Sequence, residues 1–388
     1  MTAFVNEIFT LLDANATEPL RPEARDAMND AAGLDGNPAS PHRAGRLARA
    51  RLDAAREQLA GLFGADPDEL IFTSGGTEAN AMAVSAVARP ILFGATEHDC
   101  IRNAMPDAAG PDGVSQAIPV EPDGRIALDR LDRMLSETSD AALVCLMLAN
   151  NETGVLHPVS EAAALCRRHG AWLHVDAVQA AGRIPLDLAT LGADSLALSA
   201  HKLGGPKGAG ALLLAGPRRG RLTPLIAGGG QERGRRGGTP ALPAIAGFAA
   251  AAAAAMEGLD ARADRQRRLR DRIEQNAIAA GAIVCGGAAP RLSNTTCLAL
   301  PGRRSEAQLI ALDLAGYGVS AGSACSSGKV VRSHVLDAMG LGDLAGEAIR
   351  VSLPWNVTVE AVDGFIAAYI SMVNREATNR KPHPRGAV

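Results

Sequence analysis

The sequence predicts an α/β fold, in which helices cover a mainly parallel sheet. Between residues 70 and 214, short and continuous apolar runs alternate with segments of helical period. The apolar runs are residues 70–73, 90–94, 141–148, 171–175, 195–199 and 210–214. Continuous apolar strands that alternate with amphipathic helices are typical of a parallel sheet buried on both faces. The length of 388 residues exceeds the roughly 250 to 300 at which single cores stop growing, so we expect a second domain.

The second domain is expected in the C-terminal part of the chain, as a smaller α/β unit. Its predicted strands are residues 282–285, 295–300 and 349–353, and its predicted helices are residues 306–314 and 359–373. The alanine run 249–255 and the charged segment 260–273 predict one long helix between the two units. The predicted parts are a large domain over 14–257, a small domain made of 1–13 and 258–375, and a disordered tail over 376–388.

Composition and charge exclude several functional classes. The net charge is -3 and the basic residues are dispersed, so neither nucleic acid nor a membrane is an expected partner. The sequence starts without a cationic segment followed by a long apolar one, and no run of ~18 apolar residues occurs, so we expect a cytoplasmic protein. The six cysteines form no CxxC pair, which argues against a disulfide framework and a zinc ribbon, and no metal is expected.

Two charged side chains stand at the ends of apolar runs. Lys202 follows the run 195–200 and precedes a glycine-rich turn, and Asp176 follows the run 171–175. A lysine at the end of a buried strand can be held neutral enough to form a Schiff base, and a carboxylate can keep a pyridine nitrogen protonated. Each residue alone would also fit a solvated lysine or an ordinary strand-end cap. Together, in this order, they predict a pyridoxal 5'-phosphate site at the carboxyl edge of the sheet.

The segment 73–80, TSGGTEAN, is the expected place for the cofactor phosphate. It has the pattern of a strand end, a glycine turn and a helix start. Free N–H groups at the start of a helix bind anions, and Thr77 adds a hydroxyl group. Taken alone, this motif would fit an ordinary capped helix equally well. Because the motif occurs in the same chain as Lys202 and Asp176, we interpret it as the phosphate site.

These motifs and several others resemble the cysteine desulfurases of the NifS/IscS type. This group belongs to the class V aminotransferase branch of the fold-type I enzymes that depend on pyridoxal phosphate. The matching segments are LDANAT (12–17), GNPAS (36–40), TSGGTEAN (73–80), EH (97–98), NNETGV (150–155), HVDAVQ (174–179), SAHK (199–202), GGGQER (228–233), GT (238–239), GSAC (322–325) and IRVS (349–352). The resemblance extends over residues 12–373, nearly the whole chain.

The resemblance implies a role for each matching residue. The implied catalytic residues are Lys202 as the Schiff-base lysine, Asp176 beside the pyridine nitrogen, His98 stacked on the ring, and Cys325 as the nucleophile. The other implied cofactor contacts are Gly76, Thr77, Ser199 and His201 at the phosphate, Gln179 and Asn151 near the phenolic oxygen, and Thr239 from the neighbouring subunit. The implied substrate contacts are Asn37, Asn151 and Arg350. Cys325 also lies in a glycine-bounded segment, 322–328, that is typical of a mobile loop.

The implied activity converts L-cysteine to L-alanine and leaves the sulfur as a persulfide on Cys325. Such an enzyme supplies sulfur for iron–sulfur clusters, thio-cofactors or tRNA thiolation, and it is expected as a homodimer with a sulfur-acceptor protein as partner. A selenocysteine lyase, another class V aminotransferase, and a catalytically idle sulfur-assembly partner are the alternatives. Two positions depart from the pattern: Glu18 stands where a second threonine is usual, and Cys100 follows His98 closely. Cys100 is expected to be a packing residue.

Overall fold

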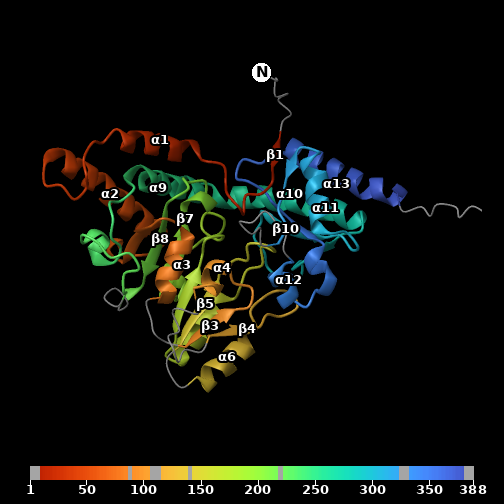
Figure 1. The fold of residues 1–388 in the computed structure, drawn as a ribbon, viewed down its shortest axis with the longest axis horizontal. Coiled ribbons are helices and arrows are strands. Elements are labelled where there is room, and N and C mark those ends of the chain that lie inside the picture. Colours follow the sequence, from red (N-terminus) through yellow and green to blue (C-terminus); the bar gives the residue numbers. More distant parts are fainter. Residues whose placement is uncertain are drawn as a thin grey trace, which may run out of the picture.

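Three β-sheets and their covering helices make up the described part of the molecule (Figure 1). The structure is a computed structural model, and it describes residues 9–85, 90–104, 115–138, 142–216, 222–322 and 332–379. The larger sheet has seven strands in the order β2-β8-β7-β6-β5-β3-β4. Its strands are β2 (Leu70–Thr73), β3 (Ile91–Gly94), β4 (Ser115–Ile118), β5 (Leu143–Met147), β6 (Trp172–Asp176), β7 (Ser195–Ser199) and β8 (Gly210–Leu214).

The larger sheet is mainly parallel, as predicted. Strands β4, β3, β5, β6 and β7 pair in parallel, whereas β8 runs antiparallel to both β7 and β2. All residues of β5, β7 and β8 are buried, which explains their continuous apolar runs. The sequence did not predict β4, because this edge strand is short, partly polar and largely exposed.

Helices cover the larger sheet on both faces. They are α1 (Pro22–Ala32), α2 (Arg43–Leu62), α3 (Gly76–Ser85), α4 (Asp99–Arg102), α6 (Leu128–Glu137), α7 (Val159–Arg168), α8 (Leu188–Leu191) and α9 (Leu242–Met256). Helices α1 and α2 pack against α9, while α3 packs on β7 and β8 (Figure 1). Strand β2 runs in the same direction as β7, and α3 follows the end of β2. Helix α3 therefore begins at the carboxyl edge of the sheet.

The predicted single linking helix is wrong, because two helices occupy this segment. Helix α9 ends at Met256 and α10 (Leu259–Ala279) begins three residues later, with a bend of 73° between them. Gly258 lies at the bend with φ 61°, a left-handed conformation that interrupts an α-helix and that glycine adopts at little cost. In the described part of the chain, no single helix has the length and apolar character of a membrane span; only the bent pair α9–α10 passes that test, on length and composition alone.

A smaller antiparallel sheet lies beside the larger one. It has the order β12-β10-β9, with β9 (Ile283–Val284), β10 (Thr295–Ala299) and β12 (Ala348–Ser352). The chain start joins this region, since β1 (Thr10–Leu11) pairs in parallel with β11 (Tyr317–Gly318). Helices α10, α11 (Ser305–Asp313), α12 (His334–Ala338) and α13 (Val359–Asn379) accompany it. These elements enclose an apolar core of their own around Phe365 and Tyr369.

The division of the chain into domains at residue 257 stays a prediction. The disordered tail predicted over 376–388 also stays a prediction; α13 runs to Asn379. Residues 380–388 lie outside the described part of the chain.

Candidate active site

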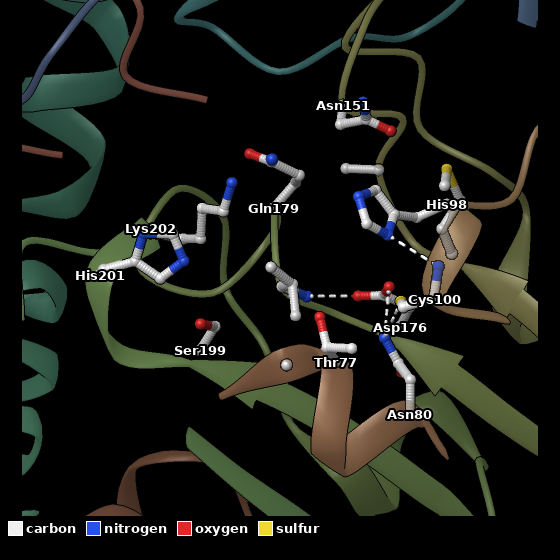
Figure 2. Close-up of a pocket in the computed structure, with 14 residues that line it drawn as sticks. Thr77, Asn80, His98, Cys100, Asn151, Asp176, Gln179, Ser199, His201 and Lys202 are labelled. Carbon is white, nitrogen blue, oxygen red and sulfur yellow. Dashed lines mark hydrogen bonds between the residues drawn. The ribbon is translucent and has the colours of Figure 1, made fainter. Parts of the chain in front are cut away.

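A cavity of about 230 Å³ lies where β5, β6 and β7 end (Figure 2). Met147, Asp176 and Ser199, the last residues of these strands, all line it. Ligands of open parallel sheets bind at this edge. The cavity brings together the following predicted site residues: Gly76, Thr77, His98, Asn151, Asp176, Gln179, Ser199, His201 and Lys202.

Lys202 supplies an amine that deprotonates readily. It ends the short 3₁₀ turn Ala200–Lys202, which directly follows β7. Its Nζ donates hydrogen bonds to the main-chain oxygens of Asn15, at 2.5 Å, and Ala16, at 3.0 Å. Burial and the guanidinium groups of Arg350 and Arg183 lower the pKa of Lys202 to about 8. A usable fraction of neutral amine is therefore present near neutral pH, as Schiff-base formation requires.

Asp176 places a buried carboxylate on the wall of the same cavity. Its Oδ2 accepts a hydrogen bond from Asn80 Nδ2 at 2.8 Å, and its Oδ1 accepts one from the main-chain N–H of Val178 at 2.9 Å. Burial raises the pKa of Asp176, although the Val178 hydrogen bond and nearby positive charge oppose the change. A buried carboxylate favours a cationic neighbour, and a protonated pyridine nitrogen is such a neighbour.

Asn80 and His174 orient the Asp176 carboxylate from behind. His174 Nε2 lies 2.8 Å from Asn80 Oδ1, and His174 Nδ1 lies 2.8 Å from Ser195 Oγ. Burial lowers the pKa of His174 to about 3, so the imidazole is neutral. Because Asn80 Nδ2 donates to Asp176, its Oδ1 faces His174 and accepts the Nε2 proton. The sequence analysis gave these residues no role, although helical spacing from Gly76 and strand spacing from Asp176 are signals for both.

The buried His174 predicts a pH-dependent mutational effect. A His174→Gln variant should lose stability at about pH 7.5, and this loss should shrink by about 2 kcal/mol at about pH 5. At pH values between the ordinary pKa of histidine and about 3, His174 binds a proton in the unfolded wild-type chain but not in the folded one. In this pH range His174 therefore lowers the free energy of unfolding of the wild type, whereas the variant has no such effect. Urea unfolding of both proteins at the two pH values measures the difference, and an unchanged difference would contradict a neutral buried His174.

The phosphate end of the cavity is formed by closely packed backbone. A Cβ on Gly76 would lie 2.6 Å from a methyl carbon of Val178, and one on Gly210 would lie 2.6 Å from Gly75 Cα. Glycine therefore lets the start of α3 lie directly against β8, with its first N–H groups unpaired within the helix. Burial and the charge of Lys202 lower the pKa of His201 to about 4, which leaves a neutral ring able to donate one N–H. These features fit an anionic phosphate group.

His98 and Cys100 form the wall on the α4 side (Figure 2). The main-chain N–H of Cys100 donates to His98 Nδ1 at 3.1 Å, so His98 caps α4 and its ring orientation is fixed. Burial and the Asp176 charge raise the pKa of the Cys100 thiol well above its usual range. Cys100 is therefore a protonated thiol and a poor nucleophile, as expected of a packing residue.

The Gln179 amide and the two terminal nitrogens of Arg350 form hydrogen bonds within the protein. The Gln179 amide donates to the Asn15 oxygen at 2.9 Å and accepts from Arg183. Arg350 Nη2 donates to Asp13 Oδ1 at 2.6 Å, and its Nη1 donates to the Asn151 oxygen at 3.2 Å. Arg350 does not line the described cavity, but it contacts the backbone of Asn151, which does.

Two further predicted residues, Asn37 and Thr239, lie outside this cavity. Asn37 is in the turn before α2, where its Oδ1 accepts from the Ala39 N–H at 2.9 Å, and Thr239 lines a separate cavity. Cys325 lies outside the residues that the structure describes. The roles expected for all three stay predictions. Among the described residues, no group of three or more His, Cys, Asp or Glu side chains is arranged to hold a metal ion.

Comparison with known proteins identifies the family. A family model named aminotransferase class V matches residues 10–365. The chain belongs to the class V aminotransferase family. It is 42% identical to a cysteine desulfurase of Cereibacter sphaeroides over 94% of this chain and 95% of that protein, and 37% identical to an IscS-like cysteine desulfurase of Mycobacterium tuberculosis over 90% and 92%.

Solved structures of this family share the fold. A NifS-like protein from Rickettsia africae has a TM-score of 0.87 and 32% identity, and the match covers 94% of this chain and 99% of that one. The predicted fold class, an α/β fold of the pyridoxal-phosphate fold-type I, is confirmed. Class V aminotransferases of the cysteine desulfurase type are enzymes that depend on pyridoxal phosphate, and the amine, the carboxylate and the anion site of this cavity fit that cofactor.

Proposed function

We propose that this class V aminotransferase is a cysteine desulfurase that converts L-cysteine to L-alanine and stores the sulfur as a persulfide on Cys325. The observation that carries the proposal is the cavity at the ends of β6 and β7. There, a lysine with a pKa of about 8 and a buried aspartate line the same cavity, in a chain that closely resembles cysteine desulfurases. A selenocysteine lyase or an idle partner is the alternative outcome of the tests below.

The described residues would hold pyridoxal 5'-phosphate in one orientation. The residues proposed at the phosphate are Gly76, Thr77, Ser199 and His201, with Thr239 from a second subunit. Asp176 would pair with the ring nitrogen and His98 would lie against the ring, with Gln179 and Asn151 at its oxygen side. Bound there, the cofactor supplies a sink for the electron pair left on the substrate Cα when its proton is removed.

Lys202 is proposed to move the substrate protons. Its free amine accepts the Cα proton, because its pKa of about 8 is close to neutral pH. Asp176 remains ionised beside a cation, since the two groups neutralise each other in a buried site. Arg350 and Asn37 are the proposed substrate contacts, and a guanidinium suits the carboxylate of L-cysteine because it binds bidentately.

Cys325 is proposed as the sulfur acceptor within the enzyme. Its thiolate attacks the substrate sulfur, so that a sulfur–sulfur bond forms while the substrate carbon–sulfur bond breaks. The electron pair of the broken bond stays on carbon, and a proton completes the methyl group of alanine. Cys100 is a poor candidate for this step because its thiol is buried and protonated.

Intact mass measurement tests the proposed function directly. The purified protein, incubated with L-cysteine without a reductant, should gain the mass of sulfur at Cys325, while alanine appears in solution. Release of alanine with no added mass on the protein would favour a lyase. An unchanged protein and no alanine would overturn the enzymatic proposal.

Asp176→Asn should keep the cofactor but slow the reaction. The phosphate contacts are untouched, whereas a neutral amide cannot hold the ring nitrogen protonated, so turnover should fall by about a hundredfold or more. Absorbance reports the bound cofactor and alanine release reports turnover. Asp132→Asn, in a surface ion pair with Arg168, is the matched control and should behave as the wild type. Near-normal turnover of Asp176→Asn would show that its proposed role is wrong.

We further propose a homodimer that works in the cytoplasm and passes its sulfur to an acceptor protein, such as an iron–sulfur scaffold. Thr239 supports the dimer, because it lines a cavity with Ser74 and Gly208 rather than the Lys202 cavity of its own chain. A threonine so placed can contact the cofactor of a second copy. Free cysteines such as Cys145 suit a reducing compartment. Sedimentation at several concentrations measures the oligomer.

A further inference from the structure

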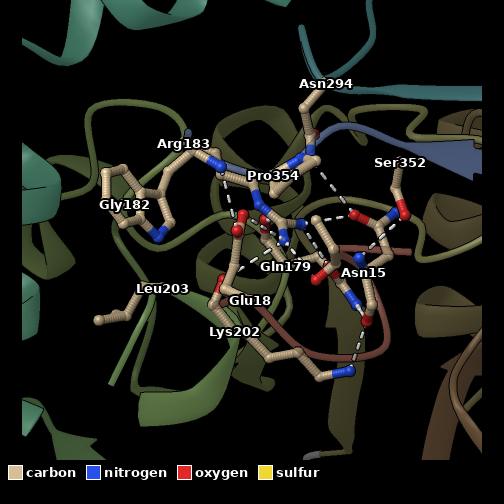
Figure 3. Close-up of polar contacts among 12 residues, drawn as sticks. Asn15, Glu18, Gln179, Gly182, Arg183, Lys202, Leu203, Asn294, Ser352 and Pro354 are labelled. Carbon is tan, nitrogen blue, oxygen red and sulfur yellow. Dashed lines mark hydrogen bonds and ion pairs between the residues drawn. The ribbon is translucent and has the colours of Figure 1, made fainter. Parts of the chain in front are cut away.

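A buried ion pair lies directly behind Lys202 (Figure 3). Arg183 Nη2 is 3.5 Å from Glu18 Oε1, and each side chain is only 5% exposed. Neither residue lines the cavity, and neither received a role from the sequence. A buried charged pair is costly to maintain unless further hydrogen bonds satisfy both partners, so the other contacts of this pair indicate what it does.

Arg183 joins the segment 14–16 to the backbone of Lys202. Its Nη1 donates to Asn15 Oδ1 at 2.8 Å, and its Nη2 donates to the Ala14 oxygen at 3.1 Å and to the Lys202 oxygen at 3.3 Å. One planar guanidinium thus sets the distance between this segment and the lysine. A lysine side chain at this position could not make these contacts together, because its single ammonium group lacks the planar fork.

Glu18 fixes the other end of the same segment. Its Oε2 accepts a hydrogen bond from the main-chain N–H of Trp355 at 3.1 Å, and its own N–H donates to the His201 oxygen at 2.9 Å. The segment between Ala14 and Glu18 is therefore held at both ends against residues 201–202. The carbonyl groups between these two anchor points have no freedom to turn away from the Lys202 side chain.

Those carbonyl groups are the ones that receive the amine. The main-chain oxygens of Asn15 and Ala16, which we name the carbonyl cradle, both accept hydrogen bonds from Lys202 Nζ. The Asn15 oxygen also accepts from Gln179 Nε2 at 2.9 Å. Two fixed acceptors for one amine define a resting place for Lys202 Nζ, whose side chain lines the cavity.

We propose that Glu18 and Arg183 are positioning residues, which hold the carbonyl cradle where the Lys202 amine rests whenever it is not joined to the cofactor. This inference rests on the proposed function. During turnover the lysine is released when the substrate takes its place, and it must return to the same carbon afterwards. An amine held in one orientation returns faster than one that moves freely, because its orientation is already set.

The pair also sets the charge around the amine. The groups that face Lys202 are the cations Arg350 and Arg183, the carboxylates Asp13 and Asp176, and the neighbouring His201. Arg183 favours the neutral amine, and Glu18 offsets part of that influence because it lies against the same guanidinium. Loss of either charge should therefore move the Lys202 pKa, and in opposite directions.

Covalent capture of pyridoxal phosphate by the full-length protein, freed of cofactor beforehand, measures both effects. In this step the neutral Lys202 amine adds to the aldehyde carbon, its protons pass to the carbonyl oxygen, and one water leaves as the carbon–nitrogen double bond forms. The visible absorbance of the product gives the rate over a pH series. The pH midpoint reports the pKa of the amine, and the plateau rate reports its positioning. No substrate is needed.

The variants should separate positioning from charge. Arg183→Lys keeps the charge but loses the fork, so its plateau rate should fall about tenfold while the midpoint stays in place. Arg183→Gln should raise the midpoint by about half a pH unit, and Glu18→Gln should lower it by a similar amount. A double variant, Glu18→Gln with Arg183→Gln, avoids an unpaired buried charge; its midpoint should return to the wild-type value while capture stays slow.

The surface pair Arg168–Asp132 provides matched controls, and Arg168→Gln and Asp132→Asn should leave both quantities unchanged. Circular dichroism confirms that each variant is folded, and any single variant that fails to fold is replaced by the double variant. Wild-type rates and midpoints in Arg183→Lys, Glu18→Gln and the double variant would overturn the inference. Absence of capture by the wild-type protein would instead overturn the proposed function.

Discussion

A Lys202→Ala variant should lose both the visible absorbance of covalently bound pyridoxal phosphate and the release of alanine. Among the residues that the structure describes, Lys202 is the one lysine that lines the cavity, so this part of the chain offers no second amine to join the cofactor or to move the Cα proton. Turnover should fall by at least about a thousandfold. Absorbance spectra and alanine assays of equal amounts of folded protein measure the two losses.

The partners of Lys202 make this substitution cleanly interpretable. Among the described residues, its Nζ donates hydrogen bonds only to the carbonyl oxygens of Asn15 and Ala16, so alanine breaks no direct ion pair. We therefore expect unfolding temperatures close to that of the cofactor-free wild type. An unchanged visible spectrum in the folded variant would show that another residue joins the cofactor.

A Cys325→Ser variant should bind the cofactor and L-cysteine but release almost no alanine. Lys202, Asp176 and Arg350 are unchanged, whereas a hydroxyl group is a poor nucleophile toward sulfur and cannot store a persulfide. Alanine release should drop below about one per cent of wild type, and no sulfur should be added to the protein. Spectral change on addition of L-cysteine, together with intact mass, measures these outcomes.

Cys100→Ser is the control for this experiment. The Cys100 thiol accepts a hydrogen bond from Asn80 at 3.2 Å, and burial keeps it protonated, so its replacement should preserve persulfide formation on Cys325. Full activity of Cys325→Ser would move the nucleophile elsewhere or favour a lyase. Loss of persulfide only in Cys100→Ser would assign the nucleophile to Cys100.

The sequence predicted the strands and helices that can be recognised from a run of neighbouring residues. Buried strands such as β7 are continuous apolar runs, and the residues directly after them, Lys202 among them, must lie at one edge of a parallel sheet. The bend at Gly258 was missed because alanine-rich and charged segments both favour helix, while the left-handed φ of one glycine decides the break.

The remaining parts of the site depend on contacts between distant segments. Glu18 and Arg183 are unremarkable in their local sequence, and only the fold shows that they pair behind Lys202. Helical spacing from Gly76 makes Asn80 a candidate for the site, but only the fold shows that it donates a hydrogen bond to Asp176. A local sequence pattern predicts which residues are buried or cap a helix, but it does not predict which buried groups from distant segments contact each other.

The pairing of β1 with β11 has a consequence for the order in which the site is assembled during synthesis. Residues 10–16 leave the ribosome long before their partners, since Thr10 pairs with Tyr317 and the Asn15 N–H donates to Ser352 Oγ at 3.0 Å. This segment must therefore wait for partners that are translated much later. Lys202 and Asp176 emerge midway, but the segment that carries the receiving backbone oxygens gains its Ser352 contact only when β12 has been made. A nascent chain arrested before β12 should consequently capture pyridoxal phosphate poorly, even with its lysine and aspartate already folded into the larger sheet.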